Sequence, residues 1–187
     1  KIKIETKCWE RDWEILLKTN RIEKLIEYNN YPFSTISLLI NNVNNINKVK
    51  HYADKLIDKN VLTEYIVVDD YADQALELFK ITKESLGKGY YYSIAELVGI
   101  YLSKDDYILH FSSDSFLKKK ISWIDKAVRR LDNNNKIANL VWNEKYHQAK
   151  DEAFSQDDDF YYSYGFSDQM YLIKTEDFNK PIYSEKH

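Results

Sequence analysis

The chain has 187 residues, of which 44% are hydrophobic, and a formal net charge of −3. This length suffices for one hydrophobic core, so we expect a single domain over residues 1–187. The slight negative charge excludes a broad basic face, and we expect no nucleic-acid partner. No apolar stretch approaches the roughly 20 residues that cross a bilayer, which predicts no membrane span. The single cysteine, Cys8, excludes an internal disulfide and fits a cytoplasmic protein or one peripheral at a membrane.

The first half of the chain alternates between helical and strand-like patterns. We expect a helix over 8–28, a strand over 35–40, a helix over 46–58, a strand over 65–68 and a helix through 75–79. The helices show apolar side chains near the 3.6-residue period, whereas the strands are short apolar runs. The asparagine-rich segment 41–45 lies between the first predicted strand and its helix, and we interpret it as a loop.

The second half continues this alternation until an irregular segment interrupts it. We expect a helix over 92–103, a strand over 107–111, a helix over 121–131, and strands over 137–142 and 170–173. The acidic and aromatic segment 148–164 is predicted to be an excursion that forms a lip over the binding crevice. Strands that alternate with helices predict an α/β fold with a mostly parallel central sheet and helices on both faces.

Acidic residues stand where two of the predicted strands end. Asp69 and Asp70 follow the strand at 65–68, and Asp114 follows the strand at 107–111. In an open α/β sheet, ligands bind outside the carboxyl ends of the strands, where carboxylates can hold a divalent cation. A second interpretation stays open, because aspartates after a strand also cap the following helix. For Asp114 that would be a helix beginning near Lys118.

Three segments in this order resemble a known family. They are Ser-Leu-Leu-Ile-Asn-Asn-Val-Asn at 37–44, Val-Val-Asp-Asp at 67–70 and Tyr-Ile-Leu-His-Phe-Ser-Ser-Asp at 107–114. Together they resemble the nucleotide-sugar half of a GT-A-fold glycosyltransferase, closest to glycosyltransferase family 2, over roughly Phe33 to Trp142. The resemblance implies a Rossmann-like GT-A nucleotide-diphospho-sugar transferase fold. It also implies metal-assisted transfer of a sugar from a UDP- or GDP-linked donor to a glycan, lipid or protein acceptor, with Mn²⁺ or Mg²⁺ as cofactor.

The resemblance also implies roles for individual residues. Asp114 matches the last residue of the family's DxD motif and would be the metal ligand, whereas Ser112 stands where the motif has its first aspartate. Glu96-Leu97 stands where the family commonly has an Arg-Asn pair. The residues expected to bind the nucleotide sugar are Asn42, Asn44, Asp69, Asp70, Lys88, Ser112 and Ser113.

Further candidates have plainer alternatives. Lys88 lies between two glycines and could reach a diphosphate, although a simple turn explains the same pattern. Asp168 is the candidate catalytic base, since an inverting transferase needs a carboxylate near the attacking hydroxyl. In the family that the chain resembles the base tends to come later in the sequence, so Glu176, Asp177, Glu185 or a residue beyond His187 stay open as alternatives. His187 is a candidate metal ligand, but it is the last residue of this sequence. His110 lies inside an apolar strand, and a core histidine explains it better than a ligand.

Two other functions remain open. One is a non-catalytic GT-A-like binding or scaffolding domain, which the serine at position 112 favours. The other is a nucleotidyltransferase, which usually has a Gly-rich, basic loop after its first strand. The segment 41–45 contains neither glycine nor a basic residue, which speaks against that class.

Overall fold

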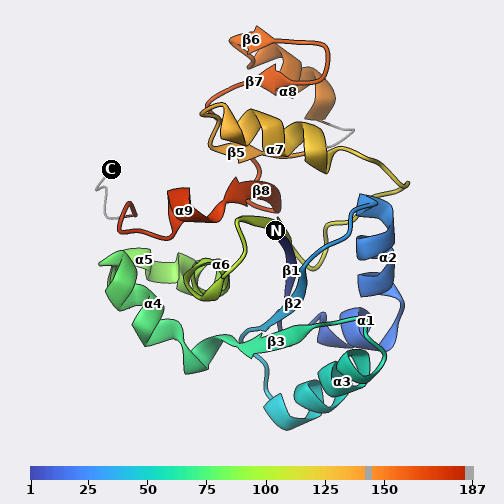
Figure 1. The fold of residues 1–187 in the computed structure, drawn as a ribbon. Helices are drawn as coiled ribbons and strands as arrows, with labels where there is room; N and C mark the ends of the chain where they lie inside the picture. Colours follow the sequence, from blue (N-terminus) through green and yellow to red (C-terminus); the bar gives the residue numbers. More distant parts are fainter. Residues whose placement is uncertain (142–144, 184–187) are drawn as a thin grey trace.

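The computed structural model describes residues 1–141 and 145–183, and its centre is a six-stranded sheet (Figure 1). The strand order is β3-β2-β1-β4-β8-β5. The strands are β1 (Ile2–Cys8), β2 (Thr35–Ile40), β3 (Glu64–Val67), β4 (Tyr107–Phe111), β5 (Ile137–Ala138) and β8 (Met170–Lys174). Within the sheet β1 to β4 are parallel to one another, whereas β8 runs antiparallel to both β4 and β5. This confirms the predicted mostly parallel sheet.

Helices cover both faces of the sheet, as the alternating sequence pattern predicts. Figure 1 shows α4, α5, α6 and α9 on one side and α1, α2 and α3 on the other. The helices are α1 (Trp13–Lys18), α2 (Arg21–Asn29), α3 (Ile46–Asp58), α4 (Ala72–Phe79), α5 (Lys83–Leu86), α6 (Tyr90–Leu102), α7 (Ile124–Asp132), α8 (Tyr146–Asp151) and α9 (Thr175–Phe178). Two 3₁₀ turns, η1 (Val68–Asp70) and η2 (Gly87–Gly89), precede α4 and α6. A two-stranded hairpin is formed by β6 (Ser155–Gln156) and β7 (Tyr161–Tyr162).

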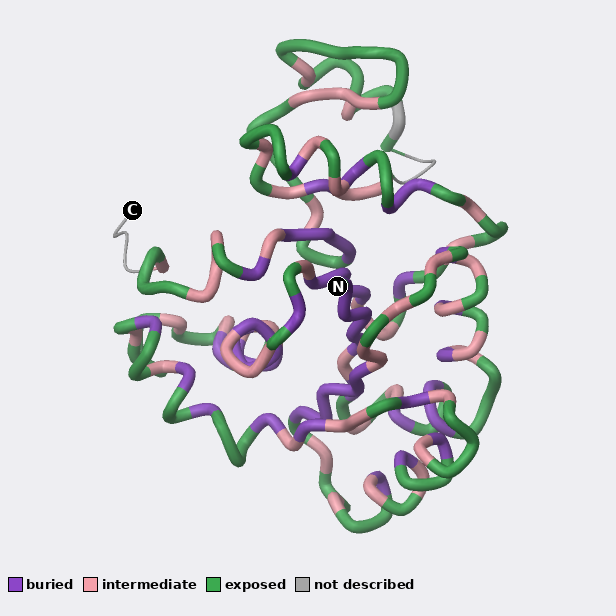
Figure 2. Tube along the Cα trace, in the orientation of Figure 1, coloured by how far each residue is buried: buried purple, intermediate pink, exposed green. Residues whose placement is uncertain are grey.

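The hydrophobic core lies in layers on the two faces of the sheet, and Figure 2 shows the buried residues gathered along the central strands. On one face, side chains of β3, β4 and β8 pack against α4 and α6. On the other face, β1 and β2 pack against α1 and α3, while β4 and β8 pack against α2 and α7. Removal of this apolar surface from water is the main force that holds the helices on the sheet.

The N-terminal segment differs from the prediction. Residues 2–8 form β1 in the middle of the sheet, so the strand at 35–40 is second in the chain and Cys8 is buried in a strand rather than in a helix. The predicted helix over 8–28 is two helices, because the backbone of Thr19 is extended and ends α1 before α2 begins. The apolar period alone did not show this interruption.

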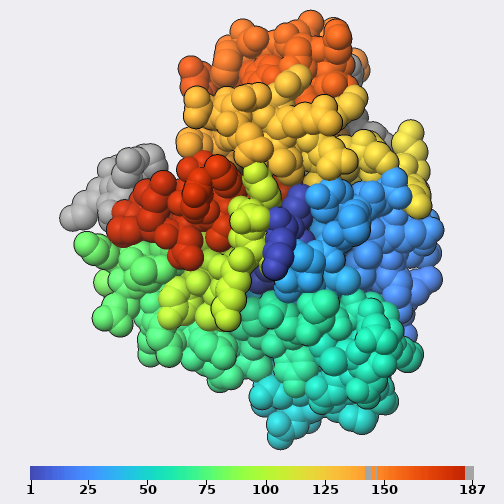
Figure 3. Space-filling model, viewed as in Figure 1, coloured from blue at the N-terminus to red at the C-terminus, as the bar shows by residue number. Residues whose placement is uncertain are grey.

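Differences of another kind occur toward the C-terminal end. The predicted strand over 137–142 is the short β5, and Trp142 lies outside the described residues. The predicted lip at 148–164 contains α8 and the β6–β7 hairpin. Two ion pairs join this hairpin to α7, one between Arg130 and Asp157 and one between Lys126 and Asp159. Figure 3 shows this segment as a lobe beyond α7. Within the described ranges, no helix has the length and apolar character needed to cross a bilayer.

Candidate functional site at the carboxyl edge of the sheet

The four parallel strands end on one edge of the sheet, which we call the carboxyl edge. Their last residues are Cys8, Ile40, Val67 and Phe111, and the register pairs Cys8 with Ile40 and Ile40 with Val67. Since β8 is antiparallel, its first residue, Met170, also lies at this edge, where it pairs with Phe111. The described candidates that follow β2, β3 and β4 therefore lie at the same edge. Asp168, which precedes β8, lies there as well.

These candidates share an edge without meeting at one point. Strands β2 and β1 lie between β3 and β4. At about 4.8 Å per strand, Asp69 and Asp70 are roughly 14 Å from the turn that holds Asp114. One cation is therefore too small to contact both groups, although an extended ligand such as a nucleoside diphosphate can span them.

The asparagine loop after β2 is shaped by its backbone. Asn42 has a left-handed φ of 51°, and its carbonyl accepts from the Glu10 amide at 3.2 Å. The Asn44 amide donates to the Glu10 carboxylate at 2.7 Å, which ties this loop to the loop after β1. Asn41 is not among the predicted site residues. It is buried, and its side-chain amide donates to the Tyr91 carbonyl at 2.8 Å. The side chains of Asn42 and Asn44 are exposed.

Asp69 and Asp70 lie exposed in η1, and helix capping does not explain them. The residue that precedes α4 is Tyr71, and this helix has no side-chain cap. Burial first, and then the charges of Asp69 and Asp73, raise the pKa of the Tyr90 hydroxyl. Both carboxylates remain accessible to a ligand at this edge.

Asp114 is likewise not a helix cap. The next helix is α7, which begins at Ile124 after Trp123 and has no side-chain cap. Ser112 donates its amide to the Gln169 carbonyl at 2.7 Å, which joins the turn after β4 to the segment before β8. Asp114 is exposed at the tip of this turn.

Asp12 is a site residue that the sequence prediction missed. It lies in the loop after β1, where its carboxylate accepts from the Trp9 amide at 2.8 Å and from the Ser113 hydroxyl. Burial is the main cause that raises the pKa of Asp12, and the charge of Asp114 raises it further against the effect of these hydrogen bonds. Asp12 and Asp114 therefore form a pair of neighbouring carboxylates. The signal was hidden because residues 8–12 were assigned to a helix.

This pair could hold a divalent cation, but with few protein ligands. In the described part of the chain no group of three or more His, Cys, Asp or Glu side chains is arranged to hold a metal. Mg²⁺ and similar ions are often bound by one or two carboxylates, with water and substrate phosphates completing the shell. Asp114 and Asp12 fit this kind of site. His187 lies outside the described residues.

The remaining candidates lie at the rim or on the sheet. Asp168 is exposed just before β8, and its charge contributes to the raised pKa of the Tyr171 hydroxyl after the larger effects of burial, Glu96 and Glu5. Lys88 is exposed in η2, where Gly87 has a left-handed φ of 52° that glycine adopts without strain. His110 is fully buried, with Nδ1 3.1 Å from the Glu5 carboxylate.

The fold is that of the GT-A glycosyltransferases, as comparison with solved structures shows. The chain superposes on the galactosyltransferase LgtC, solved with donor and acceptor sugar analogues, with a TM-score of 0.51 and 14% identity, over 95% of this chain and 59% of LgtC. It superposes on mouse xyloside xylosyltransferase 1 with a TM-score of 0.52 and 14% identity, over 98% of this chain and 70% of that enzyme. No family model and no curated protein matches the sequence.

Proposed function

We propose that this chain is the nucleotide-sugar half of a glycosyltransferase that moves a sugar from a UDP- or GDP-linked donor to an acceptor hydroxyl. The observation that carries the proposal is the placement of Asp12, Asp69 and Asp114 along the carboxyl edge of a GT-A-type sheet. The fold alone does not fix an activity, so the argument depends on this edge.

In this proposal Asp114 and Asp12 would hold a Mn²⁺ or Mg²⁺ ion, which would supply positive charge beside the departing diphosphate. The protein's own groups set the positions. The Ser113 hydroxyl donates a hydrogen bond that holds Asp12 in place. The hydrogen bond from the Ser112 backbone amide to the Gln169 carbonyl fixes the turn that presents Asp114. The exposed carboxylates Asp69 and Asp70 are placed to accept hydrogen bonds from the nucleoside.

Asp168 is the proposed general base. It stands at the start of the antiparallel strand β8 and therefore at the carboxyl edge, across β4 from β1. A base must lie within hydrogen-bond reach of the attacking hydroxyl, and an exposed carboxylate at the rim is accessible to an acceptor. The acceptor itself is a glycan, lipid or protein hydroxyl.

The nucleotidyltransferase alternative has to be assessed on a different loop. The first strand along the chain is β1, so the loop that follows the first strand is 9–12 rather than 41–45. This loop contains Arg11, which stacks over Trp9 with 5.3 Å from the guanidinium carbon to the ring centre, and no glycine. The Gly-rich feature of that class is therefore missing here as well.

Isothermal titration with UDP and GDP, with and without Mn²⁺, tests the proposal. We expect Mn²⁺-dependent binding that Asp114→Ala weakens by about tenfold or more, since the variant removes a charged ligand of the cation. Asp58→Ala is the matched control, because Asp58 is an exposed aspartate at the far end of α3. If the wild-type protein binds neither nucleotide, a scaffolding function replaces this proposal.

A further inference from the structure

Six ionisable side chains, in which acidic and basic residue types alternate, form a row across the sheet, which we call the charge row. They are, in spatial order, Glu64, Lys3, Glu5, His110, Glu96 and Lys7. The successive N-to-O distances are 3.7, 3.1, 3.1, 3.5 and 2.5 Å. Lys3, Glu5 and Lys7 alternate along β1 and therefore point to the same face, the one that α6 covers.

The middle of the charge row is fully buried. Lys3 and Glu5 are each 1% exposed, and His110 is 0% exposed. The Lys3 charge and the His110 hydrogen bond together outweigh burial and lower the pKa of Glu5, so this carboxylate is charged. Isolated charges this deep are strongly unfavourable, and those of Lys3 and Glu5 persist here because the two side chains form an ion pair at 3.1 Å.

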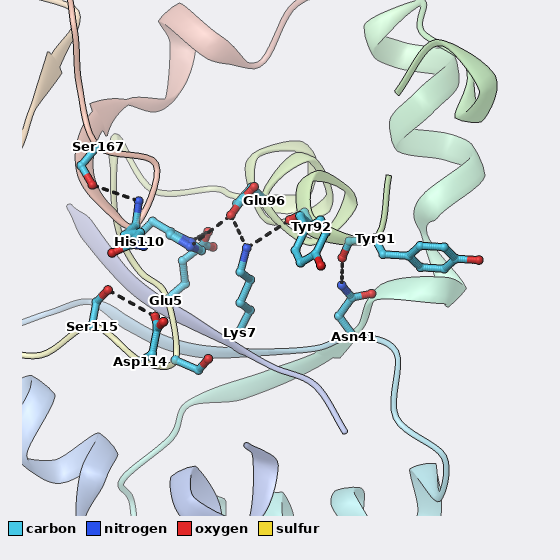
Figure 4. A network of polar contacts seen from close by, with 12 residues as sticks. Glu5, Lys7, Asn41, Tyr91, Tyr92, Glu96, His110, Asp114, Ser115 and Ser167 are labelled. Carbon is cyan, nitrogen blue, oxygen red and sulfur yellow. Dashed lines mark hydrogen bonds and ion pairs between the residues drawn. The ribbon is translucent and has the colours of Figure 1, made fainter. Parts of the chain in front are cut away.

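His110 connects the buried half of the row to the half at the site. Its Nδ1 is hydrogen-bonded to the Glu5 carboxylate at 3.1 Å, whereas its Nε2 faces the Glu96 carboxylate at 3.5 Å without a hydrogen bond. The Tyr171 ring stacks on the imidazole with a 5.0 Å separation of the ring centres, which fixes its plane. Glu96 is thereby held from one side by His110 and from the other by Lys7 (Figure 4).

The two ends of the charge row differ in what they face. Glu64, 44% exposed, begins β3 at the edge opposite the site. Lys7 is 20% exposed. It is the penultimate residue of β1, so it ends the row at the carboxyl edge. Its Nζ donates to Glu96 and to the Tyr92 carbonyl at 3.0 Å. An ammonium group carries three donors, and these two bonds use two of them.

We propose that Lys7 binds the diphosphate of the nucleotide ligand, and that Glu96 and His110 are positioning residues that hold its ammonium group at the carboxyl edge. The inference rests on the proposed function. Asp12, Asp114 and Asp168 all bring negative charge to this edge, and a diphosphate needs fixed positive charge there besides any cation. Lys7 ends the row at this edge, and its ammonium group supplies such a charge.

Titration of UDP, in Mn²⁺ and at several KCl concentrations, tests the role of Lys7. Lys7→Met is expected to bind UDP about tenfold more weakly than wild type and with a smaller dependence on salt, because a charge contact to phosphate is lost. Lys7→Arg keeps the charge and is expected to restore both. Lys136→Met is the matched control. It removes a lysine whose Nζ lies 3.0 Å from the Asp177 carboxylate of α9, at the edge of the sheet opposite the site.

Glu96→Gln separates a direct contact of Lys7 with the phosphates from a merely structural role of the charge row. The amide oxygen still accepts from Lys7, while one negative charge near the phosphates disappears. We therefore expect UDP binding at least as tight as that of wild type. Parallel weakening in Lys7→Met and Glu96→Gln, or unchanged UDP affinity in Lys7→Met, would overturn the inference. Absence of UDP and GDP binding by the wild-type protein would instead overturn the proposed function.

Discussion

At the scale of single residues, Gly99 shows how closely α6 approaches the buried charges of β1. A Cβ atom at position 99 would lie 2.6 and 2.7 Å from the two carboxylate oxygens of Glu5. Glu5 cannot retreat, because Lys3 and His110 hold it from both sides. The absence of a side chain at position 99 is therefore what allows α6 to cover the charge row.

This contact predicts that Gly99→Ala destabilises the protein, although replacing a mid-helix glycine by alanine normally stabilises a helix. Alanine in place of a mid-helix glycine stabilises by about 1 kcal/mol, whereas forcing extra volume into a packed core costs about 1–3 kcal/mol. We expect the clash to prevail, so that Gly99→Ala lowers the free energy of unfolding by about 1 kcal/mol in urea titrations. Gly89→Ala is the control, since nothing lies within 4 Å of a Cβ there. A stabilised Gly99→Ala would contradict the close packing.

At the scale of elements, Asp157 holds the β6–β7 hairpin together and fastens it to α7. Its carboxylate accepts from the Tyr162 hydroxyl at 2.7 Å, from the Phe160 amide at 2.8 Å and from Arg130 of α7 at 2.8 Å. The Tyr162 bond, the backbone amides and Arg130 lower the pKa of Asp157 from 3.8 to about 2. One ionised side chain therefore joins the two strands of the hairpin and the helix beside it.

We expect the hairpin to open in acid before the central sheet does. A lowered pKa means that the stabilisation is present above the ordinary value of 3.8 and is lost as the pH falls through about 2. Hydrogen exchange should show early loss of protection in residues 155–162 below that ordinary value, and Asp157→Asn should show it already at neutral pH. Equal protection in this variant and in wild type at neutral pH would mean that the hairpin is held by its apolar contacts instead.

At the scale of the whole molecule, β1 is the strand on which the structure depends. It is hydrogen-bonded to β2 and β4 and contributes buried side chains to two of the core clusters. Cys8, at the end of this strand, is 0% exposed, and burial, followed by the charge of Asp12, raises the pKa of its thiol. Both effects make the thiol unreactive while the strand is in place.

The only cysteine of the sequence therefore serves as a probe of global unfolding. We expect a thiol reagent to modify Cys8 negligibly in native buffer and to modify it along the same denaturant transition that circular dichroism reports. The physical reason is that exposure of Cys8 requires β1 to leave the centre of the sheet. Rapid modification without denaturant would show that the N-terminal strand opens independently.

Much of this architecture follows from local sequence. The apolar runs at 35–40, 65–68 and 107–111 predicted β2, β3 and β4, and the helical period predicted α3 over 46–58 with the observed bounds. Such predictions succeed because a strand buried on both faces must be apolar along its length. The strand ends then placed Asp69, Asp70 and Asp114 on one edge, since parallel strands end together.

The tertiary structure alone decided what β1 is and what it adds to the site. Its sequence, Ile-Lys-Ile-Glu-Thr-Lys-Cys, carries charges at every second position and does not have the apolar run of a central strand. Lys3 and Glu5 are buried and Lys7 is partly buried, and their partners Glu64, Glu96 and His110 come from distant parts of the chain. A charge is tolerated in a core only beside an opposite charge, and a local pattern does not contain that partner. For the same reason Asp12 and Lys7 became visible only in the folded chain.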